Sequence, residues 1–204
     1  MTTQIYGAAQ LDRPRHRFIL DDYHAMAEVG ILGEDDRVEL IGGEVVQMAA
    51  MGARRAGRVQ RLTRLLLPVL SDGVQLRVQL PVAIPDYDEP EPDLALVRAR
   101  EDDYDQSHPT PADVLLLIEV ADTSLVYDRG VKFPIYARAG IPETWIADPS
   151  GTSVERHGDP DTETGAYRSV AWFGLGETVR SSVLAELTLP VDSVLGRASS
   201  GSSS

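Results

Sequence analysis

Two carboxylates stand at the ends of expected hydrophobic strands, where their chemistry suggests a metal site. Glu119 lies near the end of DVLLLIEVA (113–121), the most apolar segment of the chain, and Asp93 opens the preceding expected strand, PDLALVR (92–98). Neighbouring strands of one sheet would bring the two carboxylates close together. Because Mg²⁺ is commonly held by one or two carboxylates and several waters, the pair predicts a magnesium site.

Each carboxylate also has a purely structural interpretation. A carboxylate in an apolar strand is costly to bury unless it is paired, hydrogen-bonded or bound to a cation. Glu119 could therefore form a salt bridge with Arg129 or cap a helix, and Asp93 could be a turn residue after Pro92. If the two converge, each disfavours ionisation of the other without a cation. We then expect a strained metal-free site, with Asp93→Asn at least as stable as the parent protein.

The chain contains a single lysine, Lys132, among its 19 Lys and Arg residues. Arg and Lys are not equivalent where a compact point charge is needed, so this position invites a functional interpretation. Lys132 lies on an expected helix over 126–139, with Asp128 and Tyr136 one turn away on either side. Its ammonium could orient a nucleophile or stabilise an anionic transition state. The alternatives are chance and an exposed helix lysine paired with Asp128.

Composition limits the class of protein. A chain of 204 residues with 43 % hydrophobic content predicts one domain over 17–196, a flexible segment over 1–16 and a flexible Gly/Ser tail over 197–204. The chain has no cysteine, and its four histidines are scattered, which argues against disulfides, thiol chemistry and a histidine-rich metal site. Neither an apolar span nor a secretory signal is visible, so we expect a cytoplasmic protein without a membrane segment.

The net charge of −13 argues against a protein that coats nucleic acid non-specifically. Any contact with a polyanion should then be local. Arg54, Arg58 and Arg61 fall on one helical face with no acid between residues 54 and 64, and this arginine stripe could contact phosphates. The alternative is a solvated face that pairs with acids elsewhere in the fold.

The periodicity of the chain predicts a mixed α/β domain. A short helix begins at Asp21 or Asp22, and RVELIGGEVVQM (37–48) predicts a hairpin with Gly42 and Gly43 at its turn. An amphipathic helix follows over 53–70. Further strands are expected over 74–84, 92–98, 113–121 and 143–148, a helix over 126–139, and short peripheral strands around 154, 167–172 and 188–194.

The order of the acidic residues and the lysine resembles a known nuclease pattern. Glu39, Glu91-Pro92-Asp93, Glu119 and Lys132 together look like the PD-(D/E)xK superfamily. More closely, RVELIGGEVVQM, EPEPDLALVR and HPTPADVLLLIEVADTSLVYDRGVKFPIYARAGIPETWIAD resemble the Uma-two (Uma2) family of endonucleases over residues 18–195. In that family the lysine has moved from the strand to the following helix, which explains Ala121 two residues after Glu119. Members often carry a histidine about where this chain has Arg55.

The resemblance implies a restriction-endonuclease-like fold, with a mixed β-sheet core flanked by helices. It also implies Mg²⁺-dependent hydrolysis of nucleic-acid phosphodiesters, most simply in DNA, with Mn²⁺ as a substitute ion. Asp93 and Glu119 would hold the metal, Lys132 would be the electrostatic catalyst, and Glu39 would assist through a water or a second ion. The formation of a homodimer is left open by the sequence. The alternatives are a catalytically silent protein that binds nucleic acid or a protein partner, and a hydrolase of small phosphate esters.

Overall fold

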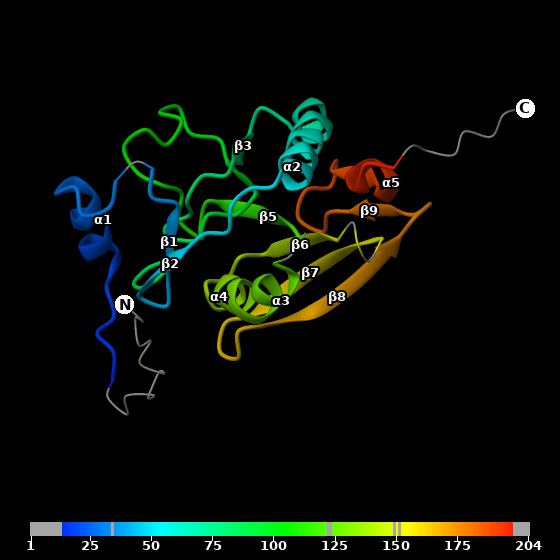
Figure 1. The fold of residues 1–204 in the computed structure, drawn as a ribbon. Helices are drawn as coiled ribbons and strands as arrows, with labels where there is room; N and C mark the ends of the chain where they lie inside the picture. The colour runs from blue at the N-terminus through cyan, green and yellow to red at the C-terminus, as the bar shows by residue number, and fades with distance from the viewer. Residues whose placement is uncertain (1–13, 34, 122–123, 149, 151, 198–204) are drawn as a thin grey trace, which may run out of the picture.

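The computed structural model of the chain describes residues 14–33, 35–121, 124–148, 150 and 152–197. Most of the two segments expected to be flexible, 1–13 and 198–204, lies outside the described residues. A six-stranded sheet forms the centre, in the order β3-β4-β5-β6-β7-β8 (Figure 1). These strands are β3 (Val74–Val78), β4 (Leu94–Arg98), β5 (Val114–Val120), β6 (Glu143–Asp148), β7 (Ser153–Asp161) and β8 (Ala166–Gly174). Only β5 and β6 pair in parallel within this sheet, so the predicted mixed sheet is confirmed.

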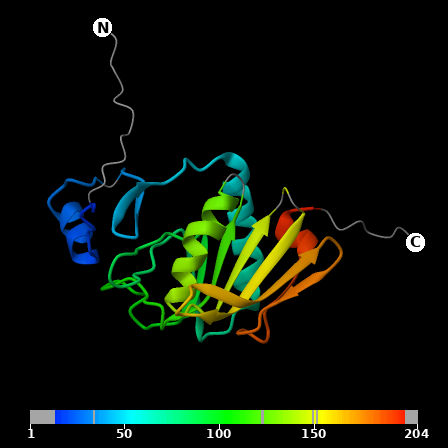
Figure 2. The ribbon, with the colours of Figure 1, turned by 90° about the horizontal axis from the view of Figure 1, so that it is seen from below.

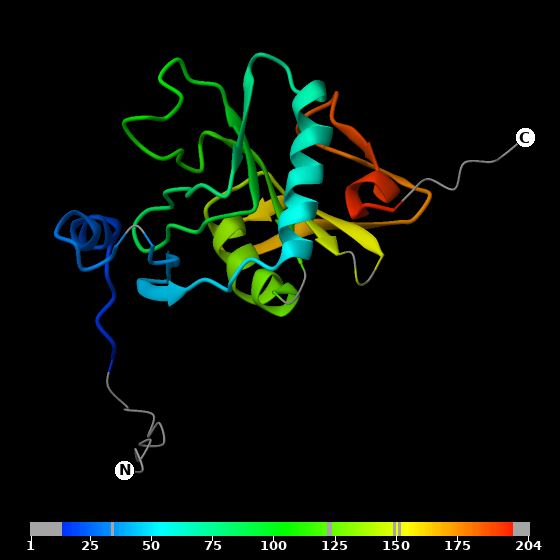
Figure 3. The same cartoon turned by 45° about the horizontal axis from the view of Figure 1, so that its top comes forward.

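Helices cover both faces of this sheet (Figures 2 and 3). Helix α2 (Ala53–Leu66), a short 3-10 turn (Leu67–Val69) and α5 (Val191–Leu195) lie on one side. A helical segment of α3 (Leu125–Tyr127), a π-helical turn (Asp128–Lys132) and α4 (Phe133–Arg138) lies on the other. The alternation of side chains along β4 decides which core each residue joins: Leu94 and Leu96 pack with α2, whereas Ala95 and Val97 pack with α4.

The N-terminal part of the fold lies at one end of the sheet (Figure 1). It consists of α1 (Leu20–Glu28) and the hairpin of β1 (Val38–Ile41) and β2 (Glu44–Gln47). Gly42 and Gly43 form the hairpin turn with φ of +58° and +77°, which glycine tolerates without a steric penalty.

A second small sheet pairs β9 (Thr178–Arg180) with β10 (Thr188–Pro190). None of the helices in the described ranges has the length and apolar character that a membrane-spanning helix needs.

Four of the expected elements differ from the observed ones. The strand over 74–84 ends at Val78, because Gln79 takes a positive φ of +51° and turns the chain away from the sheet. The strands near 154 and 167–172 are not short peripheral pieces: β7 and β8 are nine residues each and belong to the central sheet. The helix over 126–139 is interrupted by a five-residue π-helical turn that ends at Lys132.

Candidate active site

Strands β4 and β5 bring Asp93 and Glu119 together. Leu94 pairs with Ile118 in antiparallel register, so Asp93 comes just before this pair and Glu119 just after it. Both carboxylates lie within 4.0 Å of one Arg55 nitrogen, Nη2. The predicted convergence is therefore observed, and the salt bridge of Glu119 with Arg129 is not: Arg129 pairs with Glu155 instead.

Asp93 is buried and is held by hydrogen-bond donors only. The Val120 backbone N–H donates to Oδ2 at 2.8 Å, and the Gln79 amide donates to Oδ1 at 3.3 Å. Arg55 Nε lies 3.1 Å from both carboxylate oxygens and Nη2 lies 2.9 Å from Oδ2, which makes a forked ion pair. The expected repulsion without a cation therefore does not apply to Asp93, because Arg55 already supplies it with a cation.

Glu119 is fully buried, and only one of its oxygens is hydrogen-bonded. The Tyr136 hydroxyl donates to Oε1 at 2.8 Å, and Lys132 Nζ lies 3.6 Å from the same oxygen. Oε2 is buried without a hydrogen-bond partner. Burial raises the pKa of Glu119 to about 8; Lys132 acts against this shift, while Asp128 and Asp93 add to it. The second oxygen is thus a buried acceptor that calls for a donor or a cation.

Lys132 lies at the end of the π-helical turn and is buried rather than exposed, with its side chain 4 % accessible. Nζ lies 3.0 Å from Glu39 Oε2 and donates to the Glu91 carbonyl at 3.3 Å. Burial alone would lower the pKa of Lys132, but Glu119 and Glu39 outweigh it and raise the pKa. Lys132 therefore stays an ammonium. The interpretation of Lys132 as an exposed lysine paired with Asp128 is wrong, because the side chain is buried and forms its close ion pair with Glu39.

The β1–β2 hairpin carries Glu39 into the same cluster. Its carboxylate accepts hydrogen bonds from the Glu91 backbone N–H at 3.2 Å and from the Tyr127 hydroxyl at 3.3 Å, besides its contact with Lys132. A backbone bond from Glu89 N–H to the Leu40 carbonyl, 2.7 Å long, fixes the hairpin to the loop before β4. Glu39 is thus in direct contact with the ammonium.

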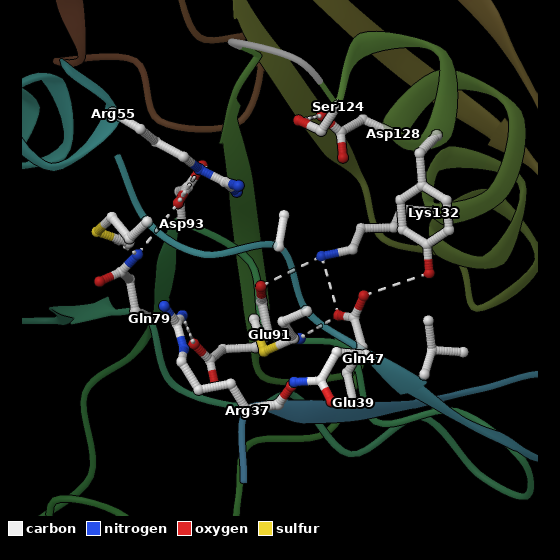
Figure 4. A pocket seen from close by; sticks show the side chains of 15 residues that line it. Arg37, Glu39, Gln47, Arg55, Gln79, Glu91, Asp93, Ser124, Asp128 and Lys132 are labelled. Atoms are coloured by element: carbon white, nitrogen blue, oxygen red, sulfur yellow. Dashed lines mark hydrogen bonds and ion pairs between the residues drawn. The ribbon is translucent and has the colours of Figure 1, made fainter. Parts of the chain in front are cut away.

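These side chains surround a pocket of about 260 Å³ (Figure 4). Water takes about 30 Å³ in the liquid, so the space admits a hydrated ion or a phosphate group. Glu39, Asp93 and Lys132 line the pocket together with Arg55, Asp128, Gln79, Glu91, Arg37 and Tyr127. Glu119 does not line it and lies buried beside it. Among the residues that the structure describes, no three His, Cys, Asp or Glu side chains form a metal-binding group, so a metal here would depend on two carboxylates and water.

Arg54, Arg58 and Arg61 lie away from this pocket. They line a separate shallow groove with Gly57 of α2 and with Leu195 and Gly196 at the C-terminal helix. The stripe expected from the sequence therefore exists as one surface. Arg55 does not join this stripe and lines the pocket instead.

The sequence model of the Uma2 family, described as "Putative restriction endonuclease", matches residues 20–192. The chain belongs to the Uma2 family. The fold agrees with this assignment: the crystal structure of "a putative nuclease belonging to DUF820" from Anabaena variabilis is similar, with a TM-score of 0.67 at 16 % identity. The similarity covers 88 % of this chain and 98 % of the other. No curated protein matches the sequence. The family assignment supports a nuclease function for this Uma2 protein, and the similar structure supports its fold.

Sequence reasoning missed three contributors to the pocket of this Uma2 protein. Gln79 and Tyr127 hold Asp93 and Glu39 by hydrogen bonds, and Arg55 occupies the position between the two carboxylates. Only Arg55 carried a signal in the sequence, because it replaces the histidine that other members often have.

Proposed function

We propose that this Uma2 protein is an endonuclease that hydrolyses phosphodiester bonds in nucleic acid with the help of Mg²⁺ or Mn²⁺, and that DNA is its substrate. The observation that carries the proposal is the clustering of the one lysine with Asp93 and Glu119: Lys132 and Asp93 line one pocket, and Glu119 lies buried beside it. Lys132 Nζ lies within 3.6 Å of Glu119, and a shared Arg55 nitrogen joins Glu119 to Asp93. A buried ammonium beside two carboxylates suits a reaction in which negative charge develops on a phosphoryl group.

The residues present fit a divalent cation. Glu119 Oε2 is a buried acceptor without a hydrogen bond, and Asp93 presents a second carboxylate beside it. Asp93 and Glu119 would hold the ion, and waters would complete the oxygen shell that Mg²⁺ prefers. When bound, such an ion stabilises charge on a phosphoryl oxygen and makes water a better nucleophile.

The remaining residues of the chain would position these groups. Tyr136 fixes Glu119, while Gln79 and the Val120 N–H fix Asp93. Glu39 holds the ammonium of Lys132 in place, and Lys132 is the group proposed to stabilise the anionic transition state. Glu39 was expected to act through a water or a second ion, and its direct contact with Lys132 favours the role of a positioning residue.

We place the nucleic-acid backbone along α2. Arg54, Arg58 and Arg61 form the stripe on this helix, and the N-terminal turn of the same helix carries Arg55 at the pocket. A phosphate backbone that follows the stripe would thus be led to the site, and the contact would stay local in a chain of net charge −13.

One observation favours the rival hypothesis, a nuclease fold without catalysis that binds nucleic acid or a protein. Arg55 forms its ion pair with Asp93 in the space where the cation would bind. A permanent pair would exclude the metal and leave a binding protein.

The deciding experiment is a cleavage assay with supercoiled, linear and single-stranded DNA and with RNA, in Mg²⁺, Mn²⁺ or EDTA. We expect cleavage that requires metal and falls by about 10²–10³-fold in Lys132→Met, the loss typical of one transition-state contact. Glu44→Gln, at an exposed carboxylate of the hairpin, should cleave like the parent. Equal activity in Lys132→Met would indicate a contaminating nuclease and contradict the proposal. Cleavage of a small phosphodiester without cleavage of any polymer would favour the phosphate-ester alternative.

A further inference from the structure

Arg55 pairs with Asp93 (Figure 4), and its Nη2 also lies 4.0 Å from Glu119, so it occupies the place between the two carboxylates that the sequence assigns to a metal ion. Its guanidinium contacts Asp93 through Nε and Nη2 at 2.9–3.1 Å, and the same Nη2 lies 4.0 Å from Glu119 Oε2. A buried pair of carboxylates is unfavourable without a positive partner, so this cation has a clear physical reason to be there.

The guanidinium satisfies only one of the two carboxylates. Glu119 Oε2 receives no hydrogen bond, although it lies at the edge of the reach of Arg55. The planar guanidinium of Arg55 is directed at Asp93 and leaves Glu119 Oε2 without a partner. A cation that contacts both Asp93 and Glu119 would satisfy this oxygen. Arg55 is therefore an incomplete partner for the pair.

Carboxylates outnumber cationic side chains around the pocket, which favours the binding of a further cation. Among the described residues in and beside the pocket, five carboxylates face three cationic side chains. The carboxylates are those of Glu39, Glu91, Asp93, Glu119 and Asp128, and the cations are Arg37, Arg55 and Lys132. With all five carboxylates ionised, a divalent ion would balance the excess of two. A divalent ion on Asp93 would repel a guanidinium at hydrogen-bond distance from the same carboxylate, which disfavours their sharing it.

Arg55 can leave Asp93 at a lower cost than Lys132 can leave Glu39. The Arg55 side chain is 18 % exposed and borders the open pocket, whereas the Lys132 side chain is 4 % exposed and has Glu39 and the Glu91 carbonyl as partners. Asp93 would keep the hydrogen bonds from Val120 N–H and Gln79 after the guanidinium leaves. The carboxylate would thus stay oriented toward the pocket.

We infer that Arg55 is an internal counter-ion that leaves Asp93 when a divalent cation binds, and that the strength of its ion pair sets the affinity of the site for the cation. The inference rests on the proposed metal site. Arg55 competes with the metal ion for Asp93, and it stays paired with this carboxylate when the metal concentration is low. After it leaves Asp93, the guanidinium stays at the rim of the pocket, where it is available to a phosphate.

Mn²⁺ binding to the full chain tests this directly, by titration calorimetry and by the rise of the melting temperature with Mn²⁺. Arg55→Gln should bind Mn²⁺ at least about tenfold more tightly than the parent, equivalent to about 1.4 kcal/mol. Arg54→Gln makes the same charge change on the neighbouring residue, outside the pocket, and should bind like the parent. Arg55→Lys keeps the charge without the fork and should give an intermediate affinity, which also covers the case in which Arg55→Gln does not fold.

The outcomes separate the two proposals. Tighter binding by Arg55→Gln, or binding by this variant alone, supports the counter-ion. If the parent binds Mn²⁺ and Arg55→Gln and Arg55→Lys bind equally or more weakly, Arg55 helps to build the site, and the inference is wrong while the metal site stands. If none of these proteins binds Mn²⁺, both the metal site and the counter-ion are overturned.

Discussion

Replacing Asp93 by asparagine should destabilise the metal-free protein, whereas the sequence suggests a variant at least as stable as the parent. Every partner of this carboxylate named above is a donor: Arg55, the Gln79 amide and the Val120 N–H. Asparagine offers one acceptor oxygen and turns an NH₂ group toward the remaining donors. The substitution therefore breaks the ion pair and opposes donor to donor.

The magnitude follows from burial. Removing one partner of a buried ion pair costs about 3–5 kcal/mol. Because the Arg55 side chain is 18 % exposed and can turn to water, we expect the lower end, about 3 kcal/mol. For a chain of this size, 1 kcal/mol corresponds to roughly 2–4 °C, so the melting temperature should fall by roughly 6–12 °C.

Urea unfolding in EDTA, followed by circular dichroism, measures this change. Glu44→Gln is the matched control, because it breaks an ion pair with Arg15 whose side chains are 80 % and 50 % exposed, and such pairs contribute about 0–1 kcal/mol. If Asp93→Asn unfolds within about 1 kcal/mol of the parent, about the change allowed for the exposed control pair, the ion pair does not stabilise the fold, and the repulsion expected from the sequence dominates instead.

The remaining predictions concern Tyr136 and the arginine stripe. Tyr136→Phe should lower the free energy of unfolding by about 1–3 kcal/mol, since it removes the one hydroxyl that donates to the fully buried Glu119; an unchanged urea midpoint would contradict this. Replacing Arg54, Arg58 and Arg61 together by Gln should weaken DNA binding on all sequences alike and reduce the slope of log K against log salt by about 0.9 per lost phosphate contact. An unchanged slope would mean that the stripe does not contact phosphates.

The elements that the sequence predicts best are those with strong local patterns. The segment 113–121 is apolar throughout, and β5 is buried at all seven positions. Glycines at 42 and 43 predict the hairpin because few other residues accept a positive φ at both positions. The meeting of Asp93 and Glu119 is foreseeable once β4 and β5 are neighbours, because both residues lie one position beyond the pair of Leu94 and Ile118. Their roles as metal ligands stay predictions.

Other features depend on contacts that periodicity does not encode. Strand β7 reads SVERHGDPD, in which Gly, Asp and Pro suggest a turn, yet tertiary pairing with β6 and β8 holds it as a strand. Glu39 was placed near the site only by family resemblance, since its position depends on how the hairpin docks onto the loop before β4. Arg55 and Arg54 are adjacent in sequence, and only the packing of α2 decides which of them enters the pocket.

The π-helical turn and the acceptors around its last residue favour a lysine over one more arginine at position 132. An additional residue in this turn shifts the side chains that follow, and such turns are frequent at functional sites. Nζ reaches Glu39 at 3.0 Å, the Glu91 carbonyl at 3.3 Å and Glu119 at 3.6 Å, three acceptors around one point. A compact ammonium serves such an arrangement, whereas a planar guanidinium suits a single carboxylate, as Arg55 does with Asp93.

Lys132→Arg should therefore lose both stability and cleavage activity, although it keeps the positive charge. The side chain is only 4 % exposed, so the larger guanidinium would overpack the cluster and cost about 1–3 kcal/mol. We also expect most of the cleavage activity to be lost, because the charge moves away from the point that the three acceptors define. Urea unfolding and the cleavage assay measure the two effects separately, and Arg98→Lys serves as a control at an exposed arginine outside the pocket and the arginine stripe. A Lys132→Arg protein with full stability and full activity would show that any cation suffices, and the single lysine would then be an accident of composition.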